Sequence, residues 1–121
     1  EYRESRLAEV GFKGVFPIWK QDTTDLVKEF ISKGFKTITC CINDASLNES
    51  HVGIIIDDEF VKGLPADVDP CGENGEFHTL VTCSPSFQGH IELTKRDVES
   101  GDRFSHQRYH AKALPKQIYA V

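Results

Sequence analysis

Apolar residues follow two different spacings in the first third of this chain, and each spacing predicts a different element. Residues 12–19 (FKGVFPIW) are apolar on both faces, which is typical of a buried parallel strand that ends or bulges at Pro17. Apolar residues after Thr23 recur at a helical spacing, with a threonine N-cap and with Gly34 as the stop. Residues 35–42 (FKTITCCI) return to a strand pattern. The start of the chain therefore predicts a right-handed βαβ unit.

The pattern changes after residue 43 to short elements separated by turns. Residues 51–56 are expected to be a short strand or an extended lead-in, and residues 57–64 a short helix that ends at Gly63. Further strands are predicted at residues 76–83, 89–94, 104–111 and 117–121, with a turn at 99–103. The predicted fold class is thus α/β, a βαβ unit followed by a β-rich C-terminal region.

The length and composition limit what this chain can be. A chain of 121 residues forms one domain, or less than one complete two-part unit. Its apolar runs fall far short of the roughly 20 residues that a membrane-spanning helix needs, so no membrane partner is expected. The sequence contains no methionine, and it begins without the pattern of a signal peptide. We therefore expect an internal or C-terminal piece of a longer protein.

Charge is distributed unevenly along the chain. The net charge is −5; residues 1–94 carry 8 basic and 16 acidic side chains, whereas residues 95–121 carry 6 and 3. A surface that binds nucleic acid would need a basic main body. We therefore expect no nucleic-acid partner.

The cysteines and histidines do not predict a metal site. The chain has four cysteines, Cys40, Cys41, Cys71 and Cys83. They lack the C-x2-C spacing of zinc ribbons and fingers, and we expect them to be reduced, with a Cys71–Cys83 disulfide as the alternative. His106 and His110 are four apart, as on one side of a helix, but their segment is not helical in pattern.

Residues 69–79 (DPCGENGEFHT) bring together several side chains that can bind ligands or transfer protons. Glu73 and Glu76 flank an Asn-Gly dipeptide, and His78 follows at the start of a strand. Glycines in such a loop let the backbone approach a ligand closely, and loops that hold carboxylates at the mouth of a sheet are frequent functional sites. The alternative interpretation is an Asn-Gly hairpin, in which both glutamates are exposed turn flanks.

This loop resembles the G-E-x-G-E-F/Y-x-T signature of the diphthine–ammonia ligase family, ATP-binding proteins of the PP-loop, or adenine nucleotide α-hydrolase-like, superfamily. Three other segments agree in order. Residues 2–19 resemble the family's Arg-rich stretch and F-P-L-W strand end, residues 34–47 its next strand, and residues 64–70 (LPADVDP) the lead-in to the signature. The resemblance covers about residues 2–93, and the remaining tail matches nothing that we can name.

The resemblance implies a complete protein of roughly twice this length, with an S-G-G-K-D-S-type phosphate loop for ATP in its N-terminal half. Neither that sequence nor G-x-x-x-x-G-K-[ST] occurs here. The chain therefore resembles the C-terminal half. Residues 1–43 would end the nucleotide-binding half and residues 44–121 would form the substrate-facing domain. We expect the chain alone to be inactive.

The implied reaction is amide formation at the expense of ATP, in which a carboxylate is adenylated and ammonia displaces AMP. Ammonia is mostly ammonium at neutral pH, and Glu73 and Glu76 are expected to hold it and accept its proton. Glu76 or Asp69 would alternatively hold magnesium. His78 is expected to be an acid/base group or else a structural strand residue. ATP and magnesium are the implied cofactors.

Other contacts follow from position in the resemblance. Arg3 and Arg6 would contact phosphate or be solvated helix charges, and Trp19 would flank adenine or simply pack. The substrate-binding residues expected in the loop are Asp69, Gly72, Asn74, Gly75 and Thr79.

The expected acyl substrate depends on the source. It would be the diphthine of elongation factor 2 in an archaeal or eukaryotic protein. The loop has the form that we associate with bacterial members, and bacteria make no diphthamide, so a bacterial substrate stays unknown. We expect a cytoplasmic protein that needs its N-terminal half, with homo-oligomerisation left open. The alternatives are a nucleotide-binding sensor and an interaction domain, both of the same fold and without ligase activity.

Overall fold

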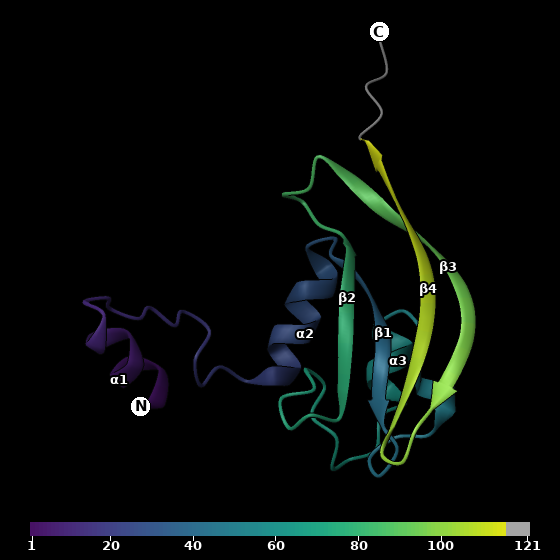
Figure 1. Cartoon of the computed structure of the whole chain (residues 1–121), viewed down its shortest axis with the longest axis horizontal. Helices are drawn as coiled ribbons and strands as arrows, with labels where there is room; N and C mark the ends of the chain where they lie inside the picture. The colour runs from purple at the N-terminus through teal and green to yellow at the C-terminus, as the bar shows by residue number, and fades with distance from the viewer. Residues whose placement is uncertain (116–121) are drawn as a thin grey trace, which may run out of the picture.

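The computed structural model describes residues 1–115, which fold around one antiparallel sheet (Figure 1). Its four strands lie in the order β2-β1-β4-β3, and every neighbouring pair is antiparallel. The elements in chain order are α1 (Tyr2–Glu9), α2 (Thr23–Ser32), β1 (Lys36–Asn43), the 3₁₀ turn η1 (Glu49–His51), α3 (Asp58–Lys62), β2 (Phe77–Cys83), β3 (Gly89–Ser100) and β4 (Phe104–Pro115).

Helix α2 begins at a side-chain cap and ends before a glycine. The side chain of Asp22 accepts a hydrogen bond from the backbone N–H of Asp25 at 2.9 Å, which caps the first turn. The cap is therefore Asp22, and the predicted threonine cap is wrong, because the Thr23 hydroxyl donates to Asp69 instead. Gly34 follows the helix with φ 86°, as predicted for a helix stop.

Helix α3 is introduced by an extended segment that lies along β1. Residues 53–56 exchange backbone hydrogen bonds with Thr37 and Thr39, such as Thr39 N–H to the carbonyl of Ile54 at 2.9 Å. Strand β4 pairs with the other end of β1, at residues 41–43. One edge of β1 is therefore shared between two partners, and the predicted extended lead-in is confirmed.

The core lies between the sheet and helices α2 and α3. Ile42 of β1 is fully buried, and its in-register neighbours on β2 and β4, Phe77 and Ser105, are buried as well. Val27 of α2 and Phe60 of α3 belong to the same apolar cluster. Both helices therefore cover the face of the sheet that carries Ile42. The rest of the cluster is Leu47, Val52, Ile56 and Val68.

The predicted α/β class is confirmed, with a helix–strand start and a β-rich C-terminal region, but the first strand of the βαβ unit does not form. Residues 12–19 pair with no strand among residues 1–115. Phe12, Val15 and Trp19 are 67%, 80% and 72% exposed. The apolar pattern predicts a buried strand, but within residues 1–115 this segment neither joins the sheet nor is buried.

We call residues 1–21 the N-terminal arm. Figure 1 shows α1 and the segment after it extending away from the sheet. Every hydrogen bond and ion pair that the arm makes within residues 1–115 stays inside the arm. The arm is thus attached to the sheet domain without being packed into it.

The β-rich region follows the prediction at β2, while β4 begins at Phe104 as predicted but continues to Pro115 instead of ending at residue 111. Strand β3 is longer than predicted, because it continues through a bulge after Lys95 to Ser100 and stays paired with β4. The strand predicted at 117–121 lies outside the described residues. The division predicted between residues 43 and 44 stays a prediction, and the sheet itself spans it. Within residues 1–115, no helix has the length and apolar character that a membrane crossing requires.

Replacement of Ile42 tests the position of the core. Ile42→Ala should lower the free energy of unfolding by about 2–5 kcal/mol, because it leaves a cavity under both helices. Ile55→Ala is the matched control, since Ile55 is 48% exposed, and it should cost less than about 1 kcal/mol. Urea unfolding followed by circular dichroism measures both, and equal losses would contradict the assignment of the core.

Candidate functional site

The loop from Asp69 to Glu76 is held in shape by a buried carboxylate. Glu76 is only 4% exposed, and its two oxygens accept the backbone N–H groups of Asp69 at 2.6 Å and Asn74 at 2.7 Å. A carboxylate that accepts backbone N–H groups makes charge-assisted hydrogen bonds, which are stronger than neutral ones. Glu76 therefore closes the loop on itself just before strand β2 begins.

Asp69 supplies a second set of bonds and ties the loop to α2. One of its oxygens accepts from the Thr23 hydroxyl at 2.6 Å. The other accepts from the backbone N–H groups of Cys71 at 2.9 Å and Glu73 at 3.3 Å. The start of α2 and the loop are thus fixed relative to each other, although 46 positions separate Thr23 from Asp69.

The glycines of the loop have a backbone role. Gly72 has φ 66°, and a Cβ atom there would lie 2.9 Å from the carbonyl oxygen of Phe77, so only glycine fits. Gly75 has φ 77° and open space around it. Because no strand precedes the loop within residues 58–76, the alternative of an Asn-Gly hairpin is wrong.

Four of the predicted site residues in this part of the chain have exposed side chains. The side chains of Glu73 and Asn74 are exposed on the loop, and His78 is exposed at the start of β2. Thr79 is also exposed and lies opposite Thr39 of β1. The predicted ligand-binding roles of these residues, and those of Asp69, Gly72, Gly75 and Glu76, stay predictions.

The predicted nucleotide contacts lie elsewhere. Arg3, Arg6 and Trp19 belong to the N-terminal arm, and Arg6 pairs with Glu9 at 3.1 Å. Within residues 1–115 none of them forms a hydrogen bond or ion pair with the loop.

The loop itself does not fit a phosphate chain or a resident metal ion. Its N–H groups at Cys71, Glu73 and Asn74 already donate to Asp69 Oδ2 and Glu76 Oε1. The other two oxygens, Asp69 Oδ1 and Glu76 Oε2, accept from the Thr23 hydroxyl and the Asp69 N–H. Among residues 1–115, no cluster of three or more His, Cys, Asp or Glu side chains could hold a metal ion. The loop therefore uses its charges to hold its own backbone.

Cys71 lies within this network. Its thiol donates to the carbonyl of Thr23 at 3.3 Å. Burial raises the pKa of Cys71 to about 11, helped by the negative charges of Asp69, Glu73 and Asp22. The thiol is therefore neutral and unreactive at physiological pH. All four cysteines are free, as predicted, and Cys71 and Cys83 form no disulfide.

The far side of the sheet carries a row of polar residues. Cys41 of β1 lies in register with His78 of β2 on one side and His106 of β4 on the other, and Glu99 of β3 lies opposite His106. In-register neighbours share one face of a sheet, and Ile42, the next residue after Cys41, faces the helices. The row therefore lies on the face that α2 and α3 do not cover.

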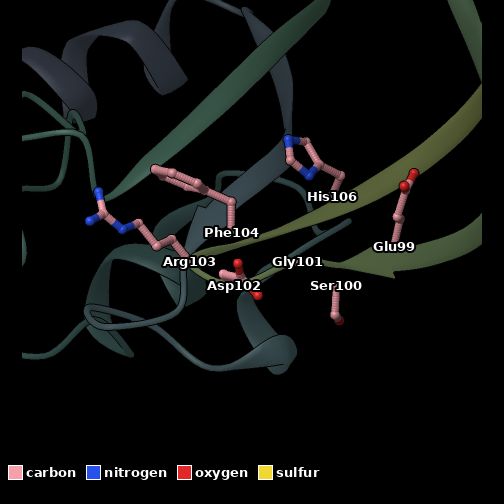
Figure 2. A pocket seen from close by; sticks show the side chains of 7 residues that line it. All are labelled: Glu99, Ser100, Gly101, Asp102, Arg103, Phe104 and His106. Carbon is pink, nitrogen blue, oxygen red and sulfur yellow. The ribbon is translucent and has the colours of Figure 1, made fainter.

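A shallow cavity of about 400 Å³ adjoins this row at the β3–β4 turn (Figure 2). Arg103, Phe104 and His106 line it, together with Glu99 and the turn residues Ser100 to Asp102. The sequence pattern predicts the turn itself. It cannot show that the turn lies near the loop, because that placement depends on strand order.

The fold and the loop define the structural class of this chain. It is a mixed α/β domain in which a loop held by two carboxylates leads into a strand of an antiparallel sheet. Residues 22–113 match the model of the diphthamide synthase C-terminal domain family, and the chain belongs to this family. It is 28% identical over 105 residues to the diphthine–ammonia ligase of Schizosaccharomyces pombe. That alignment covers 80% of this chain and 17% of that protein, so the chain spans a small part of its relative.

The role of Glu76 can be separated from that of Glu73. Glu76→Gln should lower the free energy of unfolding by about 1–3 kcal/mol, because an amide nitrogen would then face a backbone N–H. Glu73→Gln changes an exposed side chain and should have almost no effect on stability. Urea titration measures both variants. A fully stable Glu76→Gln variant would mean that the carboxylate does not hold the loop.

The raised pKa of Cys71 predicts a loss of stability in alkali. Above pH 9.0, the usual thiol value, the unfolded chain loses this proton, whereas the folded chain keeps it until about pH 11. The unfolded state is then favoured as pH rises through this window. The free energy of unfolding of the wild type should therefore fall faster from pH 9 to pH 11 than that of Cys71→Ala. Cys83→Ala, outside the loop, is the control and should follow the wild type.

Proposed function

We propose that this chain is the substrate-facing part of an ATP-dependent ligase that joins ammonia to a carboxylate. The membership of its family and the similarity to a protein named diphthine–ammonia ligase support a ligase-related role. The observation that carries the proposal is the loop itself: two carboxylates hold its backbone, the side chains of Glu73 and Asn74 are exposed, and the exposed His78 follows at the start of β2.

Some residues of this site position the loop, and others would take part in the reaction. The carboxylates of Glu76 and Asp69 accept hydrogen bonds from backbone N–H groups and thereby position the loop. Glu73 keeps a solvent-facing carboxylate that can hold ammonium and accept a proton when ammonia attacks. His78 lies on the uncovered face as a second proton-transfer group. Adenylation would supply the leaving group, and the residues that bind the nucleotide phosphates would lie in another part of the protein.

The N-terminal arm fits a contact with that other part. The family match begins at residue 22, and the arm makes no hydrogen bond to residues 22–115. Its exposed apolar side chains include Val10, Phe12 and Ile18, at 65% to 67% exposure. We place the boundary of the substrate-facing domain near residue 22, with the arm packed against the nucleotide-binding part. Arg3, Arg6 and Trp19 would then lie near the nucleotide, and the acyl substrate would be a diphthine residue.

The test is a ligase assay on the longer protein that contains these residues. With ATP, magnesium, ammonium and a diphthine-bearing elongation factor, it should form AMP and pyrophosphate together with the amide. Glu73→Gln should lower kcat by about 10²–10⁴-fold, the usual contribution of a proton-transfer group. Glu92→Gln removes the same charge from the exposed surface of β3 and should keep full activity. Nucleotide binding without AMP formation would favour a sensor instead.

A further inference from the structure

The β3–β4 turn and the loop of residues 69–76, the signature loop, flank the end of strand β1 on opposite sides. The backbone N–H of Asn43 donates to the carbonyl of Glu76 at 2.9 Å, and the next N–H, that of Asp44, donates to the carbonyl of Arg103 at 2.8 Å. The end of the loop and the end of the turn therefore flank the same two residues. Neighbouring strands are about 4.8 Å apart, so the two lie roughly 10 Å from each other.

The guanidinium of Arg103 is available to a ligand. Among residues 1–115 it has no hydrogen-bond or ion-pair partner, while Arg108, further along β4, pairs with Asp97 and Glu99 at 3.8 and 3.9 Å. Arg103 lines the cavity at the turn. Figure 2 shows Arg103, Phe104 and His106 beside one another, with the ring of Phe104 between the guanidinium and the imidazole.

The cavity is also lined by the carboxylates of Glu99 and Asp102, of which Glu99 is paired with Arg108 at 3.9 Å. The chemistry of Arg103, Phe104 and His106 indicates the ligand class. A guanidinium presents N–H groups in a planar fork that matches a carboxylate or a phosphate. Phe104 is 39% exposed and offers a ring face or edge to a flat group. His106 adds a ring nitrogen and faces His78 across Cys41. No group of metal ligands is formed there within the described residues.

We propose that the cavity at the β3–β4 turn is a subsite for an anionic oxygen group of the substrate, with Arg103 as its binding residue and Phe104 and His106 beside it. This inference rests on the proposed function, in which the anionic group is the carboxylate of the acyl substrate or the phosphate of its adenylate. It adds residues from the last part of the chain to a site otherwise built from the signature loop.

The test uses ¹⁵N-labelled chain and two probes, benzoate for the carboxylate and AMP for the phosphate. A saturable shift of the amide signals of residues 99–106 with either probe supports the subsite, and the probe that binds more tightly identifies the group. If neither probe shifts these signals, the proposal is overturned.

Variants make the test specific. Arg103→Gln should raise the dissociation constant of the bound probe by about tenfold or more, because a charge-assisted bidentate contact is lost. Arg103→Lys keeps the positive charge but lacks the planar guanidinium, and its dissociation constant should lie between those of the wild type and Arg103→Gln. Lys112→Gln removes one positive charge further along β4 and should bind like the wild type. Since Arg103 makes no side-chain bond within residues 1–115, each variant should keep the dispersed spectrum of the folded chain.

An unchanged dissociation constant in Arg103→Gln would overturn the subsite. The binding readout needs no turnover of ATP, so its failure is distinct from a failure of the ligase assay. If the chain binds the probe through Arg103 but the longer protein forms no AMP, the subsite proposal is supported and the ligase proposal is rejected.

Discussion

The carboxylate of Glu76 is the interaction on which the site depends. It is withdrawn from water and accepts two backbone N–H groups, one from each end of the loop. Without it, those part-buried N–H groups would lose their partners, which is costly. Asp69 repeats the arrangement and adds the link to α2 through Thr23. The acidic character of this loop is thus largely structural, and only Glu73 keeps its charge in solvent.

Strand β1 organises the rest of the molecule. Ile42 faces helices α2 and α3 and anchors the core, while Cys41 faces the uncovered side between His78 and His106. Asn43, the last residue of the strand, then holds the signature loop, and Asp44 directly after it holds the β3–β4 turn, each through its backbone N–H. One central strand therefore connects the stability of the domain with the placement of the candidate site.

Local pattern predicted the elements whose structure depends on near neighbours. Helix α2, with its apolar spacing and Gly34 stop, is one example, and β2 and β4 are others. The pattern failed at residues 12–19, where apolar character on both faces predicted a buried strand, but the segment is exposed and pairs with no strand among residues 1–115. It also missed the second half of β3, because a bulge after Lys95 interrupts the alternation that marks a strand.

The sequence by itself determined the mixed α/β class, the position of the signature loop and, through the resemblance of that loop, the family. Only the tertiary structure decided that Glu76 holds the loop while Glu73 faces solvent, and that Arg103 and His106 lie across strand β1 from the end of the loop. The physical reason is that spacing along the chain reports which face a residue occupies, whereas a hydrogen bond between Asp44 and Arg103 depends on strand order. That order is set by the packing of the whole sheet.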